Sequence, residues 1–363
     1  MSEIDIKLAR LRELMAQKKL DAVILQRNSS FAWITCGAPS YINTASTTGV
    51  AAAVVTLSDR YIVTNNIEAP RLEREEGLAA QGWKLHASRW YETKDLAAEL
   101  TAGLEVGSDG LMPGTANLAN EITLLRASLT AVEAERFRAL GRLCGEAMDS
   151  AIRGVRPGDT EFEIAGRLDR ATFARGVQPI VNLIATDNRI FEFRHPLPTN
   201  KQMEKYAMLV LCGRKSGLVA SITRLVHFGK LPDELKRKAD ACMRVDAAYI
   251  AGSKPGRTVA DAFKKGVDAY AAAGFPDEWQ LHHQGGLTGY EPREILGRPG
   301  ANAVVAVDQA YAWNPSIAGV KSEDTVLVTE AGHEVITQID GWDTQLIVVD
   351  GEPVVRPRVL EII

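Results

Sequence analysis

One turn-and-helix motif occurs twice in this chain, and the repeat limits the folds that the second half can adopt. Residues 154–160 (GVRPGDT) and 252–258 (GSKPGRT) each follow a long helical stretch and end in a threonine. An acid three residues further on, Glu163 or Asp261, completes a capping box that opens the next helix. Each copy leads into strand-rich sequence, so we expect two similar α/β halves in one pseudo-symmetric domain, with a site between the halves.

The first third of the chain alternates strand-like and helix-like patterns. A chain of 363 residues exceeds the usual size of a single core, so we expect about two domains. These are a small α/β domain over residues 1–125 and a larger domain over residues 126–363. Thr130 and Glu133 fit a capping box that opens a long helix ending near Arg153. The elements expected in the first domain are strands at Ala22–Leu25, Gly49–Leu57 and Tyr61–Thr64 and helices at Ile67–Gly77 and Leu96–Gly103.

Charge and composition exclude several classes of protein. A formal net charge of -4 and a pI near 6.0 provide no basic surface for a nucleic-acid backbone. The longest apolar run, Gly49–Leu57, is too short to span a bilayer, and the charged stretch Met1–Leu20 is typical of an amphipathic helix rather than a signal peptide. The four cysteines form no C-x-x-C pair, which argues against a zinc knuckle or a disulfide framework. We expect a cytoplasmic protein with neither a nucleic-acid nor a membrane partner.

Three segments carry a resemblance to a known family. They are Ser221-Ile222-Thr223-Arg224, His283-Gln284-Gly285-Gly286-Leu287 and Gly319-Val320-Lys321-Ser322-Glu323-Asp324-Thr325. With them, nearly the whole chain resembles the creatinase/prolidase/aminopeptidase P superfamily. The resemblance implies a small N-terminal creatinase-type α/β domain followed by a duplicated α+β domain, the pita-bread fold. It also implies a homodimer, in which the Trp33–Asn43 loop would reach the partner's pocket.

Most of the metal ligands that the resemblance implies are missing. The metallopeptidases of this superfamily hold two divalent ions with two aspartates, one histidine and two glutamates, because four carboxylates balance two dications. Here only His283 and Glu323 match; Ser221 and Asn314 stand at two acidic positions, and the segment 209–213 contains no acid. We therefore expect neither a metal nor another cofactor. A single zinc ion on Cys212, His283 and Glu323 is the alternative.

A metal-independent branch of the same superfamily, represented by creatinase, suggests the chemistry. In that branch a histidine after the first repeat serves as general base and then acid, and His195 stands where it is expected. Imidazole near its unperturbed pKa can take and return a proton at neutral pH. The alternative is that His195 only orients the substrate. His283 is expected to stabilise charge or bind substrate, and His282 would point away from it if this stretch is a strand.

The remaining site residues follow from the same resemblance. A buried Glu323 should meet a cation, on the substrate or on Arg224, or hold a proton. Tyr290 and Glu291 stand at the family's His-Glu position and would line the pocket. Ser221 and Asn314 would supply uncharged polar contacts.

Together these features favour a metal-independent, creatinase-like hydrolase that cleaves a C–N bond in a small polar metabolite. The alternatives are an Xaa-Pro aminopeptidase-like metallopeptidase, a pita-bread lyase, and a non-catalytic protein that binds a peptide or metabolite.

Overall fold

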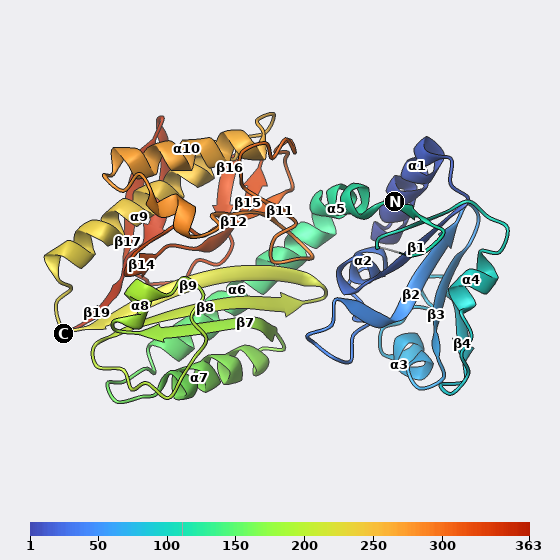
Figure 1. Cartoon of the computed structure of the whole chain (residues 1–363), viewed down its shortest axis with the longest axis horizontal. Helices are drawn as coiled ribbons and strands as arrows, with labels where there is room; N and C mark the ends of the chain where they lie inside the picture. The colour runs from blue at the N-terminus through green and yellow to red at the C-terminus, as the bar shows by residue number, and fades with distance from the viewer. Residues whose placement is uncertain (111) are drawn as a thin grey trace. The chain divides into compact units, whose positions relative to one another are not determined.

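The structure, a computed structural model, describes residues 1–110 and 112–363, which form two units (Figure 1). One unit comprises Met1–Thr130 with the short segment Ser216–Leu218. The other comprises Ala131–Lys215 and Val219–Ile363. The second unit begins with α6 (Ala131–Ile152), and this is the long helix that the pattern at Thr130 and Glu133 predicts.

The N-terminal unit is an α/β unit built on a mixed sheet. Its strands β1, β2 and β3 are antiparallel neighbours, and β4 and β5 join the sheet in parallel. The strands and helices expected from the sequence are present at the expected places. The amphipathic helix α1 is also present, with Ser2 and Asp5 forming its capping box. In spatial order the strands are β4 (Lys84–Ser88), β3 (Arg60–Asn65), β2 (Thr48–Thr56), β1 (Ala22–Arg27), β5 (Val106–Ser108) and β6 (Ala116–Asn117), and the helices are α1 (Glu3–Lys18), α2 (Asn28–Ile34), α3 (Ala69–Arg74), α4 (Leu96–Leu100) and α5 (Ala119–Ala127).

The second unit repeats one local structure, as the sequence motif predicted. Helices α7 (Glu161–Phe173) and α10 (Val259–Ala272) both begin at a threonine in a complete capping box. The turns before them also match. Gly158 and Gly256 have φ values of 95° and 84°, which glycine adopts at little cost. The Gly158 N–H donates to the Met203 carbonyl at 2.8 Å, and the Gly256 N–H donates to the Val305 carbonyl at 2.9 Å. In both copies the acceptor lies about half a repeat further along the chain.

The second unit contains two main sheets, one in each half, and they are connected to each other. In the first half, α6 and α7 pack on the sheet that contains β7 and β8 (Figure 1). In the second half, α9 (Asp233–Gly252) packs against β12. The two sheets are joined by an isolated antiparallel bridge between Thr223 and Glu323. One sheet is β19 (Leu360–Ile362), β9 (Leu218–Phe228), β8 (Tyr206–Lys215) and β7 (Gln178–Thr186); the other is β11 (Ile295–Leu296), β10 (Gly285–Thr288), β12 (Ala310–Trp313), β15 (Asp324–Thr329) and β16 (Gly332–Val335).

Shorter elements complete the second unit. Two hairpins lie outside the main sheets, and a short helix and a 3-10 turn flank the segments that carry the histidines. These elements are β13 (Ser316–Ile317) with β14 (Val320–Lys321), β17 (Thr344–Val349) with β18 (Glu352–Pro357), α8 (Arg189–Glu192) and η1 (Glu278–Leu281).

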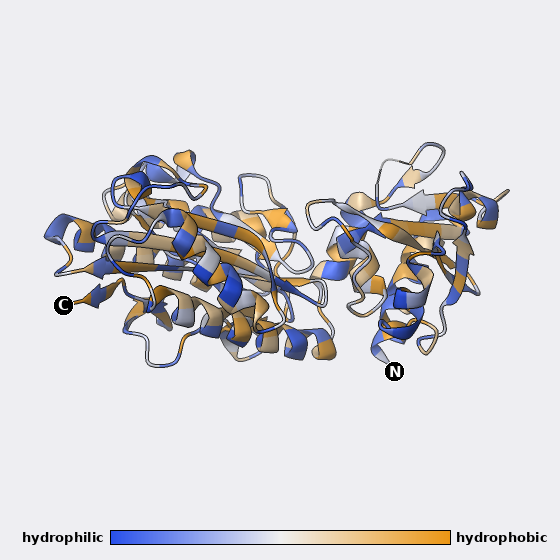
Figure 2. Ribbon diagram, turned by 90° about the horizontal axis from the view of Figure 1, so that it is seen from below, coloured by the Kyte–Doolittle hydropathy of each residue, from blue (hydrophilic) through white to orange (hydrophobic). Residues whose placement is uncertain are grey.

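Burial follows from this layered arrangement. Strands β8 and β9 are buried along almost their whole length, and α6 and α7 pack against β8. The helices carry both hydrophilic and hydrophobic residues (Figure 2), as expected for elements with one face on a core.

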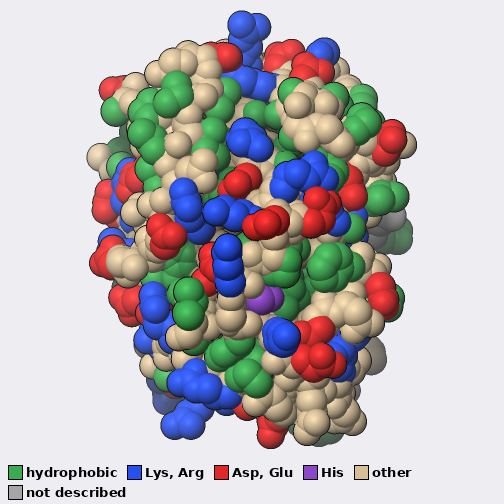
Figure 3. Space-filling model, turned by 90° about the vertical axis from the view of Figure 1, so that its left-hand side faces the viewer, with side chains coloured by type: hydrophobic (Ala, Val, Ile, Leu, Met, Phe, Trp, Pro, Cys, Tyr) green, Lys and Arg blue, Asp and Glu red, His purple; other side chains and the backbone are tan. Residues whose placement is uncertain are grey.

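Figure 3 shows charged side chains of both signs on one face of the molecule. Lysine, arginine, aspartate and glutamate side chains are interspersed there, and a histidine reaches the surface among them. Among the described residues, none of the helices has the length and apolar character needed to cross a bilayer.

Candidate active site

A cavity of about 300 Å³ lies in the second unit and takes its lining from both halves. Strands β7 and β8 supply one wall, which is largely apolar. The polar side comes from the segment after α8, from the segments on either side of β10, and from the chain between β12 and β15. The lining residues are Val181, Leu183, His195, Val210, Cys212, His283, Pro292, Arg293, Asn314, Lys321 and Glu323.

Glu323 is held by two cations of the chain itself. It is 1% exposed, and its carboxylate lies 2.8 Å from Arg293 Nη2 and 3.0 Å from Lys321 Nζ. The Thr223 hydroxyl donates to the same carboxylate at 2.6 Å. Burial alone would raise the pKa of Glu323, but the two cations and the hydroxyl outweigh it and lower the pKa to about 2. The side chain is therefore ionised at neutral pH and already balanced.

The expectation that Arg224 could pair with Glu323 is wrong. The Arg224 guanidinium lies 2.8 Å from Asp324 and is not among the residues that line the cavity. Successive residues of extended chain point to opposite sides. Thr223 therefore shares a side with Glu323, while Arg224 shares the other with Asp324. Arg224 contributes to a buried ion-pair network behind the site rather than to a substrate pocket.

Sequence reasoning missed Arg293 and Lys321 as site residues. Arg293 bridges two candidates, donating to Ser221 Oγ at 3.2 Å and to Glu323 at 2.8 Å. For Lys321 a signal was present, since it stands two residues before Glu323 and an extended chain brings such residues to one side. Arg293 lies in a loop after β10, where no periodicity could indicate its direction.

Cys212 is the residue of the segment 209–213 that stands opposite Ser221. Its Sγ lies 3.3 Å from Ser221 Oγ, and the side chain is buried. Burial and the nearby Glu323 charge raise the pKa of this thiol. Cys212 is therefore a neutral thiol at physiological pH, and neither it nor Ser221 replaces the charge of a carboxylate.

Three imidazoles form a cluster, and two of them, His195 and His283, line the cavity. His195 and His282 face each other with their Nε2 atoms 3.0 Å apart, and the His195 and His283 ring centroids are 5.2 Å apart. His195 and His283 keep exposed edges, whereas His282 is buried. Burial and nearby cations lower the pKa values of all three, to about 4 for His283. All three rings are neutral at pH 7.

His282 was expected to point away from His283 if the two lay in a strand, and that condition is not met. Strand β10 begins only at Gly285, and His282 and His283 precede it. Gly285 and Gly286 then adopt φ values of 90° and 146°, which interrupt regular extended geometry. The irregular backbone lets both histidines approach His195.

The other expected pocket residues separate into two groups. Asn314 lines the cavity and is 2% exposed, and its Oδ1 has no hydrogen-bond partner among the described residues. Tyr290 and Glu291 are not among the residues that line the cavity, contrary to expectation. The Tyr290 hydroxyl donates to Glu133 at 2.6 Å, and the tyrosine is buried. Tyr290 therefore anchors the loop to α6 and does not form a pocket wall.

The residues present do not fit a dinuclear metal centre. The five positions at which the family holds its metal ligands carry a neutral thiol, a hydroxyl, an imidazole, an amide and one carboxylate. The carboxylate already forms ion pairs with two cations of the chain. In order, the residues are Cys212, Ser221, His283, Asn314 and Glu323. A dication placed here would meet Arg293 and Lys321 with too little negative charge to offset them. A single zinc ion on Cys212, His283 and Glu323 would face the same two cations.

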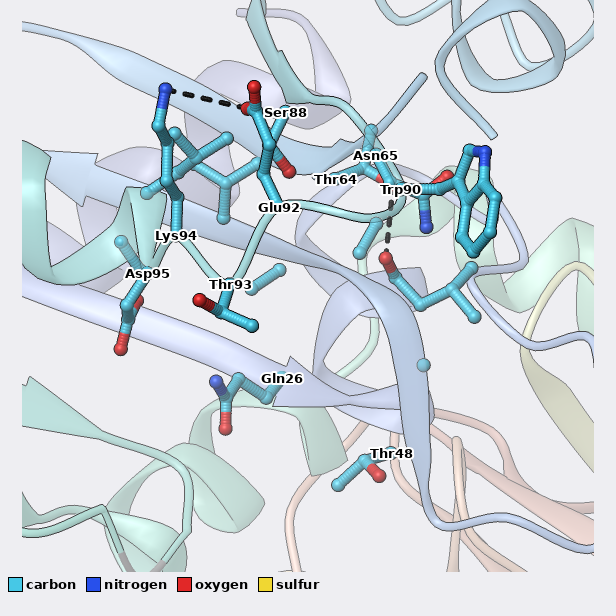
Figure 4. A pocket seen from close by; sticks show the side chains of 17 residues that line it. Gln26, Thr48, Thr64, Asn65, Ser88, Trp90, Glu92, Thr93, Lys94 and Asp95 are labelled. Carbon is cyan, nitrogen blue, oxygen red and sulfur yellow. Dashed lines mark hydrogen bonds and ion pairs between the residues drawn. The ribbon is translucent and has the colours of Figure 1, made fainter. Parts of the chain in front are cut away.

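A larger cavity, of about 580 Å³, lies in the N-terminal unit (Figure 4). Its rim includes Trp90, which is 64% exposed, and an ion pair between Glu92 and Lys94. Among the described residues that line it there is no histidine or cysteine, and Thr64 already donates to a backbone carbonyl. Size alone gives this cavity no chemistry, so the smaller cavity remains the candidate active site.

Comparison with known proteins identifies the family of the chain. Residues 135–330, more than half of the chain, match the model of metallopeptidase family M24, and residues 7–116 match the creatinase/prolidase N-terminal domain. The chain belongs to family M24. The resemblance found in the sequence and the fold expected from it, a creatinase-type domain followed by a pita-bread domain, are thereby confirmed. Membership of this family supports a hydrolase.

Relatives and solved structures of the M24 fold agree with this assignment. An uncharacterized peptidase of Bacillus subtilis is 24% identical over 92% of this chain and 98% of its own length. An uncharacterized peptidase of Staphylococcus epidermidis is 31% identical, but the match covers only 33% of this chain and 36% of that protein. The Xaa-Pro dipeptidase from Bacillus anthracis superposes with a TM-score of 0.78 at 18% identity, over 99% of this chain and all of that one. The prolidase from Pyrococcus horikoshii has the same TM-score and identity over 92% and 98% of the two chains.

Proposed function

We propose that this M24 protein is a metal-independent hydrolase that cleaves a C–N bond in a small polar metabolite. The observation that carries the proposal is the pair of cations on Glu323. Arg293 and Lys321 bind the one family carboxylate that the site retains. Because they are covalently part of the chain, they place cationic groups where the family resemblance implies metal ions.

The charge of the cavity favours a substrate that carries a carboxylate. Glu323 was expected to anchor a substrate cation, but its charge is already balanced within the chain. Arg293 and Lys321 carry two positive charges and Glu323 one negative charge, so the fixed charges sum to one positive charge. An anionic group completes the balance at lower cost than a cation would. The apolar wall formed by β7 and β8 suits an aliphatic part of the same molecule.

The cavity contains the groups that hydrolysis of an amide-type bond requires. A water molecule loses a proton to an imidazole, and its oxygen bonds to the carbon of the C–N group. The electron pair displaced onto the carbonyl oxygen is stabilised by neighbouring N–H donors. When the C–N bond breaks, its electrons go to nitrogen, and nitrogen receives the proton back from the imidazole. His195 and His283 are the imidazoles that line the cavity, and the sequence-based prediction gave the proton transfer to His195.

The test is hydrolysis of a panel of small amides, ureas and guanidino compounds, each with and without a carboxylate, in excess chelator. We expect ammonia or amine release from a carboxylate-bearing compound, and loss of that activity in Lys321→Met. Lys264→Met is the control, since Lys264 is exposed and, among the described residues, forms an ion pair with Asp268 on its own helix and with no other acid. Cleavage restricted to Xaa-Pro peptides and dependent on added Mn²⁺ would instead show a metallopeptidase.

The same panel distinguishes a hydrolase from a lyase and from a non-catalytic protein. A lyase, in which His195 removes a proton from carbon, gives products whose summed mass lacks the added water. A non-catalytic protein binds a panel compound without changing it. The open cavity with two exposed imidazoles supports an enzyme over a non-catalytic protein. A homodimer in the cytoplasm remains part of the proposal.

A further inference from the structure

The contact between His195 and His282 needs one hydrogen atom, and its position decides what His195 can do. The two Nε2 atoms are 3.0 Å apart, so one must donate and the other must accept. A neutral imidazole carries its hydrogen on only one nitrogen. If His195 holds its hydrogen on Nε2, its Nδ1 is free to take a proton. If it holds the hydrogen on Nδ1, neither nitrogen can take a proton, because Nε2 already accepts from His282 and Nδ1 already carries a hydrogen.

The donors behind His282 settle the direction. Ser316 is 4% exposed, and its hydroxyl oxygen lies 3.1 Å from Arg194 Nη1 and 3.1 Å from His282 Nδ1. A guanidinium can only donate, so Arg194 donates to Ser316 Oγ. The hydroxyl hydrogen of a buried serine then needs an acceptor. His282 Nδ1 is the only other side-chain partner of this hydroxyl among the described residues.

We propose that the chain Arg194, Ser316 and His282 fixes His195 in the tautomer with its hydrogen on Nδ1. Ser316 donates to His282 Nδ1, His282 donates from Nε2 to His195 Nε2, and His195 is left with an Nδ1–H group. His282 is thus a positioning residue. The proposal refines the proposed function by assigning its proton-handling groups.

This arrangement exchanges the roles expected for two histidines. With Nε2 engaged and Nδ1 protonated, His195 donates a hydrogen bond to the substrate instead of taking a proton. His283 has no side-chain hydrogen bond to another described residue and lines the cavity. Its free lone pair makes His283 the group that takes the proton from water and returns it to nitrogen. A donor chain that begins at a cation also polarises each bond in turn.

Histidine tautomers can be read directly by long-range ¹H–¹⁵N NMR of the full chain labelled in its histidines, without any substrate. We expect His195 as the Nδ1–H tautomer and His282 as the Nε2–H tautomer. Assignment uses His195→Gln and His282→Gln, with His86→Gln, an exposed residue of the N-terminal unit, as the control. Because no substrate is involved, the result stands whether or not the hydrolase proposal survives.

Two further measurements complete the test. Ser316→Ala removes the hydroxyl donor, so His195 should change to a mixture of tautomers; His282→Gln should do the same if Ser316→Ala fails to fold. The proposal is overturned if wild-type His195 is in the Nε2–H form. It is also overturned if neither Ser316→Ala nor His282→Gln changes the tautomer of His195. Stoichiometric Zn²⁺ binding that shifts the resonances of all three histidines together overturns it as well, since their candidate ligand atoms lie within 4.8 Å of one another.

Discussion

Replacing Glu323 by glutamine tests the ion pairs on which the proposed site depends. The substitution keeps the size of the side chain and removes its charge, leaving Arg293 and Lys321 buried without a counter-ion. The pKa of Glu323 falls from its ordinary 4.5 to about 2 on folding, which corresponds to about 3 kcal/mol of stability at neutral pH. Loss of one partner from a buried pair costs about the same. We therefore expect Glu323→Gln to lower the free energy of unfolding by about 3 kcal/mol at pH 7.

The stability that Glu323 contributes should depend on pH in a direction that can be measured. Because the pKa of Glu323 is lower in the folded protein than in the unfolded chain, its contribution is fully present above about pH 4.5 and is lost as pH falls toward about 2. Urea denaturation of the wild type and of Glu323→Gln should therefore show a constant difference near neutral pH and a shrinking one in acid.

The control for this experiment is Glu334→Gln, which breaks a surface pair with Arg138 whose glutamate is 43% exposed. That pair should be worth at most about 1 kcal/mol. A Glu323→Gln protein as stable as the wild type at pH 7 would refute the reasoning. It would mean that the carboxylate has no effective partner in the empty protein and waits for a cation of the substrate, as the sequence alone had suggested.

Three other outcomes are expected. Protein purified without chelators should contain no stoichiometric manganese, zinc or cobalt by elemental analysis, and about two ions per chain with activity lost in chelator would contradict the metal-free site. His195→Ala and His283→Ala should each lower turnover of the best panel compound by about a hundredfold or more with nearly unchanged melting temperatures, and full activity in either would remove that histidine from the chemistry. Light scattering should give twice the chain mass of 39.5 kDa, whereas a mass of one chain would rule out the expected homodimer.

The elements of the fold could be predicted because their signals are local, whereas their arrangement as a pita-bread domain followed from the family resemblance. The capping boxes before α7 and α10 and the Pro-Gly turns that precede them are fixed by residues within a few positions of one another. The strands of the N-terminal unit likewise follow from continuous apolar runs between turns. Such signals do not depend on what lies across the cavity.

The site could be predicted only in part, because its contacts join distant segments. His195, His283, Asn314 and Glu323 were found through their positions in family motifs, and all four line the cavity. Arg224 sits in an equally recognisable motif, but a one-residue step along an extended chain sends it to the opposite side. The role of a charged group depends on which side chain it pairs with in the folded protein, and the sequence alone does not show these pairs.

The charges of this site have a consequence for its chemistry. Two dications on four carboxylates both attract electrons from a substrate and ionise a water molecule. When the carboxylates are lost, the dications can no longer be held, and monovalent side chains such as Arg293 and Lys321 balance the one carboxylate left. Fixed cations can still stabilise an oxyanion, but an ammonium or guanidinium group lowers the pKa of water far less than a bound dication does. A hydrolase built this way must take the proton with a base of its own, and the imidazoles of the same cavity are the groups placed to do so.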